Sequence, residues 1–262
     1  MGVGELLRDW RHRRGLSQLE FALQAQVSTR HLSYVETGRS VPSRELVLHL
    51  AELLDVPLRE RNALLLAAGY APVFSTRTLG DGSSGMPFVR EAISRLLTSH
   101  EPYPALVIDR DWNLVDRNGS TEVLVEGVAA ELLEPPVNCL RMALHPKGMA
   151  PRIVNFGEWS SYLLRRLDHQ ILVSGDESLV ALAEEVRCFP GCGEPSGVHP
   201  GDQERVVVPL RLRGDGVELC LLNMVATLGT AVDVTAAELV IESFYPADAI
   251  TAQALGQAVS SY

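Results

Sequence analysis

A short predicted helix near the N-terminus has four polar side chains on one side, namely Thr29, Arg30, Ser33 and Tyr34. The apolar Leu32 and Val35 mark its other side. All four can donate hydrogen bonds, and a guanidinium can bond to O6 and N7 of one guanine at once. This set is typical of a helix that reads base edges and phosphates in the major groove of DNA, with Arg30 as the strongest candidate for a guanine contact.

A second short helix is predicted immediately before this one. Phe21, Ala22 and Ala25 give it an apolar face, and a polar break at residues 26–28 ends it. The hydroxyl of Ser28 is expected to cap the following helix by accepting a hydrogen bond from its first turn. Two short helices that cross steeply at a small residue form a helix-turn-helix, whose second helix enters the major groove.

Apolar patterns extend this arrangement on both sides, with Leu6, Leu7 and Trp10 before it and two further helical segments that end at Gly69. Over roughly residues 3–70 the chain closely resembles the Cro/CI-type (XRE) helix-turn-helix family. The resemblance implies an all-α domain of five helices.

The family pattern also implies roles for residues outside the base-reading helix. Gln18, at the start of the preceding helix, and Arg39, after the base-reading helix, match positions that contact phosphate in the family. Gln26 is a departure, because the family usually has glycine at this turn. A non-glycine residue there must adopt a positive φ, or the turn must shift.

The charge of the chain is uneven. The net charge is −10, but residues 1–70 carry nine arginines against eight acidic residues, so the excess of acid lies in the remainder. An acidic partner domain opposes non-specific DNA binding.

The chain has no apolar run of about 18 residues and no signal-peptide pattern, and its four cysteines lack framework spacing. We therefore expect a cytoplasmic protein that does not engage a membrane.

The length of 262 residues allows one small and one medium domain. We expect a helix-turn-helix domain over residues 1–74 and a linker with a connecting helix over 75–99. The linker is the Gly-, Ser- and Pro-containing stretch 76–87, and Val89, Ile93 and Leu97 give the connecting helix one apolar face. The second domain is expected to span residues 100–262.

The second domain alternates strand and helix signals. Strands are predicted over 105–118 as a pair with a turn at Arg110-Asp111, and over 205–213, 217–228 and 239–245, with a hairpin turn at Gly214-Asp215-Gly216. Helices are predicted over 120–133, 155–171 and 176–186, and from about Ala247. A strand pair, then helices, then three strands is the order of a PAS domain. We therefore expect an α+β domain with an antiparallel sheet and helices on one face.

Over about residues 100–258 this domain resembles the ligand-binding domain of MmyB-like transcription regulators. The resemblance rests on segments 116–118, 138–146, 150–155 with Trp159, and 235–248. It implies a PAS-like pocket for a small apolar molecule, with fatty acids as one class of ligand. The alternative is a domain used only for dimerisation or protein docking, whose apolar side chains simply fill one another's space.

Ten residues are candidates for the pocket. Phe156, Trp159, Leu163, Leu221, Met224 and Phe244 supply apolar surface from helix and sheet. A carboxylated ligand would need a cation or a hydrogen-bond donor near the mouth. The candidates for that role are Arg141, His145, Arg152 and Asn155.

Other side chains offer little chemistry. Cys188, Cys192 and His199 are too few for a zinc site, and His145 or His169 could serve as an axial ligand only if haem were bound. Asp109 and Asp111 are expected in a solvent-facing turn. The chain has no nucleophile elbow, phosphate loop or dinucleotide fingerprint. We therefore expect no enzyme activity, no metal and no required cofactor. We also expect a homodimer on DNA, because one helix-turn-helix reads few base pairs.

Overall fold

The computed structural model describes residues 1–79, 85–193, 207–214 and 216–259. It divides into two compact units. The first unit comprises Met1–Arg77 with two later segments, Leu172–Gly175 and Thr230–Ala237, and the second comprises the rest. Several predicted features, namely residues 80–84 of the linker, His199, the start of the strand predicted over 205–213, and Asp215, lie outside the described residues.

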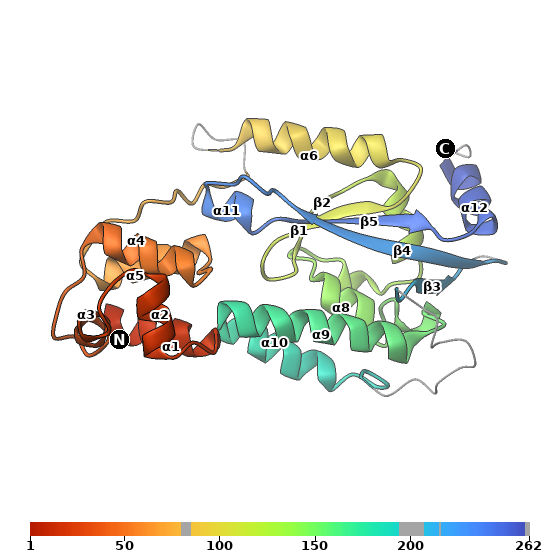
Figure 1. Cartoon of the computed structure of the whole chain (residues 1–262). Coiled ribbons are helices and arrows are strands. Elements are labelled where there is room, and N and C mark those ends of the chain that lie inside the picture. Colours follow the sequence, from red (N-terminus) through yellow and green to blue (C-terminus); the bar gives the residue numbers. More distant parts are fainter. Residues whose placement is uncertain (80–84, 194–206, 215, 260–262) are drawn as a thin grey trace. The chain divides into compact units, whose positions relative to one another are not determined.

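The first unit is built on five helices (Figure 1). Their bounds are α1 Val3–Arg13, α2 Gln18–Gln24, α3 Thr29–Glu36, α4 Arg44–Leu53 and α5 Leu58–Ala67. Each helix contributes a fully buried apolar side chain to one shared core, in chain order Leu7, Phe21, Leu32, Leu50 and Leu65. The five-helix prediction is confirmed.

Local hydrogen bonds and backbone angles define the turn between α2 and α3. The Ser28 hydroxyl accepts a hydrogen bond of 3.1 Å from the amide of His31, which confirms Ser28 as the N-cap of α3. Gln26 has a φ of 56°, so of the two alternatives at this position the residue adopts the positive φ. Gln26 adopts the left-handed conformation that glycine would adopt at lower cost.

A segment distant in sequence also belongs to the first unit. Helix α11, Val234–Ala237, begins after Asp233. The carboxylate of Asp233 accepts hydrogen bonds from the Ser75 hydroxyl at 2.6 Å and from the amide of Thr235 at 2.9 Å. The amide of Val234 donates to the Ser75 carbonyl at 2.8 Å. No local sequence pattern indicates this pairing, because the partners are 158 residues apart.

The second unit contains a five-stranded antiparallel sheet with the order β2-β1-β5-β4-β3. The strands are β1 Ala105–Ile108, β2 Leu114–Arg117, β3 Leu210–Arg213, β4 Glu218–Thr227 and β5 Val240–Pro246. The first and last parts of the domain meet in the middle of the sheet, where β1 pairs with β5 from Ala105 opposite Ser243 to Ile108 opposite Val240. The predicted α+β fold with an antiparallel sheet is confirmed.

Side chains alternate between two cores on the two faces of this sheet. Leu106 and Phe244 face the larger core, together with α8 Cys139–Leu144, α9 Phe156–Ser174 and α10 Glu177–Arg187. On the other face, Val107 and Ile241 pack with helix α6, Pro87–His100 (Figure 1). The main helices thus cover one face, and the connecting helix α6 adds cover on part of the other.

One predicted helix is wrong in extent. Residues 120–133 form the 3-10 turn η1 Gly119–Thr121, the short helix α7 Glu122–Val125 and the 3-10 turn η2 Ala130–Leu132. Gly127 has a φ of 72°, which a continuous right-handed helix cannot include. The last helix, α12 Ala249–Val259, starts close to its predicted position, and none of the described helices is long and apolar enough to cross a membrane.

Candidate functional site

The outward face of α3 carries the polar residues expected to meet DNA. Arg30 is exposed, and Thr29, Ser33 and Tyr34 are half-buried beside it. The Nε of Arg30 donates a hydrogen bond of 3.0 Å to the Tyr34 hydroxyl, one helical turn later, and its guanidinium lies 5.4 Å from the centre of the Tyr34 ring. Tyr34 therefore limits the conformations open to Arg30, which lowers the entropy lost when Arg30 binds.

A second cation lies at the C-terminal end of the same face. The guanidinium of the exposed Arg39 lies 5.9 Å from the Tyr34 ring, and the Arg39 amide donates to the Tyr34 carbonyl at 2.8 Å. The structure thus brings Arg30 and Arg39 together around one aromatic ring. Their positive charge adds to the surface that α3 presents.

Gln18 is held differently from the other candidates. Its side-chain amide donates a hydrogen bond of 3.0 Å to the carboxylate of Glu36, at the end of α3. The same carboxylate is paired with the buried guanidinium of Arg11. Gln18 therefore ties the start of α2 to the end of α3, and its predicted phosphate contact stays a prediction.

Gly4 sets the position of α3, and sequence reasoning missed it. A Cβ atom on Gly4 would lie 2.1 Å from the carbonyl oxygen of Val35 and 2.9 Å from that of Glu36. Only glycine lets α1 approach the end of α3 this closely. A glycine inside a predicted amphipathic helix was the available signal for this close approach.

Two adjoining hollows lie under the sheet of the second unit. The outer hollow, of about 160 Å³, is lined by Leu114, Arg117, Thr121, Val125, Leu133 and Val137, among others. The inner hollow, of about 50 Å³, is lined by Trp112, Cys139, Trp159, Leu163, Glu242 and Phe244, among others. Leu106, Leu124 and Met142 line both. The two hollows are therefore neighbours along one apolar path.

The predicted apolar pocket residues fall into two groups. Trp159, Leu163 and Phe244 line the inner hollow. Leu221 is fully buried in the core, Phe156 is half-buried, and the side chain of Met224 is 60% exposed. None of these three is among the described residues that line either hollow.

The residues predicted to bind the carboxylate head group of a ligand, here called the head-group candidates, form hydrogen bonds to other parts of the protein. The guanidinium of Arg141 makes two hydrogen bonds, of 2.7 and 2.6 Å, with the carboxylate of Glu185. Arg152 donates to the carbonyl oxygens of Val123, Glu126 and Arg213. These bonds fasten backbone segments together.

The other two head-group candidates also have partners. The side chain of Asn155 donates to the Pro209 carbonyl at 2.8 Å and accepts from the Arg211 amide at 3.1 Å. The Nδ1 of His145 accepts from the Lys147 amide, and its ring lies 4.9 Å from that of Phe189. Among the described residues that line the two hollows, none of the four head-group candidates is present.

The wall of the inner hollow carries a buried ion pair that sequence reasoning missed. Arg166 and Glu242 approach to 2.6 Å, and the Glu242 side chain is only 9% exposed. Arg166 also lies 4.6 Å from the centre of the Trp112 ring, and Asn223 donates to the second Glu242 oxygen at 3.2 Å. Because the pair is neutral overall, the hollow does not present an unbalanced charge to an apolar ligand.

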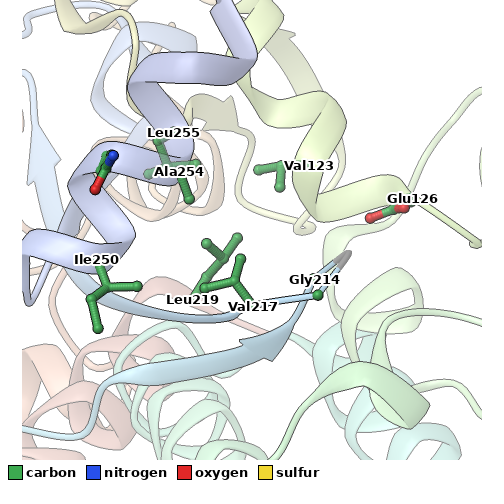
Figure 2. A pocket seen from close by; sticks show the side chains of 10 residues that line it. Val123, Glu126, Gly214, Val217, Leu219, Ile250, Ala254 and Leu255 are labelled. Atoms are coloured by element: carbon green, nitrogen blue, oxygen red, sulfur yellow. The ribbon is translucent and has the colours of Figure 1, made fainter.

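The second unit also carries an open groove of about 470 Å³ (Figure 2). It lies between α12, the β3–β4 connection and the end of α7, and its lining includes Val217, Leu219, Ile250 and Leu255. Among the described lining residues the only charged side chain is Glu126, which pairs with Arg152 at 2.9 Å. The groove is therefore a poor site for a carboxylated ligand.

The remaining candidates for chemistry do not assemble into a site. Within the described part of the chain, no three His, Cys, Asp or Glu side chains are grouped so as to hold a metal. Cys188 and Cys192 are free thiols, and His169 is exposed on α9. Asp109 organises its own turn, because its carboxylate accepts from the amides of Asp111 and Asn113.

The five-helix unit with an N-capped α3 and a polar outward face is a helix-turn-helix DNA-binding module, and it precedes an α+β sensor-like domain in the same chain. Comparison with family models agrees: residues 3–64 match a helix-turn-helix domain, and residues 89–258 match the MmyB-like transcription regulator ligand binding domain. The second match covers more than half of the chain, so the chain belongs to the MmyB-like transcription regulators. No curated protein matches it. Members of this family are transcription regulators and not enzymes.

Proposed function

We propose that this regulator binds duplex DNA in a sequence-specific manner by inserting α3 into the major groove. Arg30 reads a guanine, and Thr29, Ser33 and Tyr34 complete the contact surface. Gln18 and Arg39 contact phosphates on either side, and Ser28 orients the first turn of α3. The observation that supports this most directly is the exposed Arg30–Tyr34 pair, which holds a guanidinium on the outer face of α3.

The regulator binds its operator as a homodimer. One α3 contacts only a few base pairs, which is too few to discriminate an operator from genomic DNA. Two copies about 34 Å apart would read successive major grooves. The second unit carries the dimer contact, because residues 1–70 contain no heptad pattern of a coiled-coil zipper.

The second unit binds a small apolar molecule of the fatty-acid class in the two hollows, of which the inner one lies between the sheet and α9. Trp159, Leu163 and Phe244 meet its chain. Burial of apolar surface stabilises such a complex by about 25 cal/mol per Å². The ligand can change the affinity for DNA only to the extent that it binds one arrangement of the protein more tightly than another.

The size of the hollows favours a second candidate function. Ligand pockets usually measure about 300–1,000 Å³, whereas the two hollows measure about 160 and 50 Å³. A domain whose interior is almost filled by its own side chains fits a dimerisation or docking role. If the second unit binds a ligand, the side chains that line the hollows must move apart to admit the ligand's acyl chain.

Two cavity-filling variants separate these possibilities. Leu133→Trp places an indole in the outer hollow, and Ala254→Trp places one in the groove beside α12. Native mass spectrometry with a panel of fatty acids should show binding to the wild type and to Ala254→Trp, and loss of binding in Leu133→Trp. A loss in Ala254→Trp alone would move the site to the groove, and binding by none of the three proteins would favour the docking role.

A further inference from the structure

Arg117 occupies a distinctive place at the rim of the outer hollow. It is the last residue of β2 and pairs across the strands with Leu106, which lines both hollows. Its side chain is 37% exposed, so its guanidinium lies where the hollow meets solvent. Among the described residues that line the two hollows, it is the only basic side chain.

A buried hydroxyl holds this guanidinium at the rim. Nη1 of Arg117 donates to Oγ1 of Thr121 at 3.1 Å, and Thr121 is 1% exposed. The Thr121 hydroxyl in turn donates to the Asn118 carbonyl at 2.6 Å, which leaves its oxygen free to accept from Arg117. The cation is therefore positioned before any ligand arrives, which lowers the entropic cost of binding.

The present partner of the cation is easily displaced. Nη2 of Arg117 lies 2.7 Å from the carboxylate of Glu122, whose side chain is 62% exposed. Exposed pairs of this kind contribute little to stability, because solvent screens both charges. A carboxylate that arrives with an apolar chain gains the burial of that chain in addition to the same ionic contact.

We propose that Arg117 is the head-group residue of the cavity, and that the ligand is an anionic amphiphile whose carboxylate replaces that of Glu122. The inference rests on the proposed ligand-binding function and specifies its chemistry. The ligand carboxylate binds at the rim, and its chain passes Leu106 and Met142 toward Trp159. Glu122 acts as an internal competitor, so an uncharged amphiphile gains nothing from the exchange.

The test compares decanoate with 1-decanol, which share a chain and differ in the head group. Calorimetry on the full-length chain should show that wild type prefers decanoate. Arg117→Met should weaken decanoate binding by about tenfold and leave 1-decanol binding within about twofold. Glu122→Gln should strengthen decanoate binding several-fold, because the competitor is gone. Arg211→Met is the matched control and should change neither affinity, since Arg211, which is 35% exposed, forms a 2.6 Å pair with Glu218 outside the hollows.

A second readout tests the orientation of the ligand's acyl chain in the hollows. Trp112 and Trp159 line the inner hollow, so bromine at the far end of 10-bromodecanoate should quench tryptophan fluorescence, whereas decanoate should not. Equal loss of decanoate and 1-decanol in Arg117→Met, or an unchanged preference for decanoate, would overturn the assignment of Arg117 while ligand binding stands. Binding of neither probe to the wild type would overturn the ligand function and the assignment together.

Discussion

The guanidinium of Arg11 in α1 donates hydrogen bonds of 2.7 and 2.9 Å to the carboxylate of Glu36 at the end of α3, and the two side chains are only 7% and 2% exposed. A third donor, Gln18 of α2, reaches the same carboxylate. Glu36 therefore links three helices around the element that we expect to enter the groove. Buried charges are tolerated only when they are paired in this way.

Glu36→Gln should destabilise the first unit by roughly 3–5 kcal/mol, because Arg11 would remain buried without a counter-charge. Hydrogen exchange of amides in α1 and α3 should accelerate, and those of the β-sheet should not. The control is Glu52→Gln, an exposed position on α4, which should change stability by less than about 0.5 kcal/mol. Equal protection of α1 and α3 in both variants would show that the pair does not hold the bundle.

Gln26→Gly should stabilise the first unit by about 0.5–1 kcal/mol. The residue has a φ of 56°, and glycine removes the steric cost of that conformation, although part of the gain is offset by a more flexible unfolded chain. Gln26→Val should be destabilising, because a β-branched residue fits the left-handed region worst. Urea denaturation curves of both variants give the comparison, and a glycine variant less stable than wild type would contradict it.

Local rules predicted most of the fold. The Ser28 cap follows from neighbours along the chain and is confirmed, and of the two alternatives left open at Gln26 the structure has the positive φ. The helix predicted over 120–133 failed because the apolar residues there also fit a short helix ended by Gly127. The Ser75–Asp233 contact could not be predicted, since no local pattern links residues so far apart.

The thiol of Cys139 should resist alkylation. Burial, and then the nearby charges of Glu242 and Asp109, raise the pKa of this thiol to about 12. At pH 8 its thiolate fraction is about a thousandfold lower than for an ordinary cysteine with a pKa near 9. Iodoacetamide followed by peptide mass mapping should therefore modify the exposed Cys188 first and leave Cys139 unmodified. Comparable rates at the two thiols would contradict this.

The same thiol makes stability depend on pH in the alkaline range. Its pKa is higher in the folded chain, so folding favours the neutral thiol. This contribution is fully present below about pH 9 and is lost as the pH rises toward 12. Cys139→Ala should remove this part of the pH dependence, as urea denaturation of the two proteins at pH 8 and pH 10.5 would show. An identical fall in both proteins would assign the dependence to other groups.

The site was harder to predict than the fold. The apolar residues Trp159, Leu163 and Phe244 line the inner hollow, because the period of a helix and the alternation of a strand fix which way they face. The head-group candidates could not be ranked, since the carboxylate that binds Arg141 and the carbonyls that bind Arg152 are 26–61 residues away. Sequence shows which side chains are charged and not which charges are already paired.

The proposed homodimer predicts a dependence on operator symmetry. The intact chain should bind an operator with two half-sites about 34 Å apart far more tightly than one with a single half-site, because the second contact forms at high effective concentration. The intact chain is needed, since Ser75 bonds to Asp233 and a fragment ending near Ser75 would lose that partner. Light scattering of the complex should give two chains per operator. One chain per operator, with equal affinity for both DNAs, would rule out the dimer.

The most direct test of the regulator account compares Arg30→Ala with Arg39→Ala on the operator selected by the wild type. Arg30→Ala should cost about 1–3 kcal/mol of binding free energy and relax the base preference at one position, as expected for a residue that reads guanine. Arg39→Ala should weaken binding to all sequences alike and reduce the salt dependence, as expected for a phosphate contact. An Arg30→Ala variant with unchanged affinity and unchanged base preference would show that α3 does not read the groove.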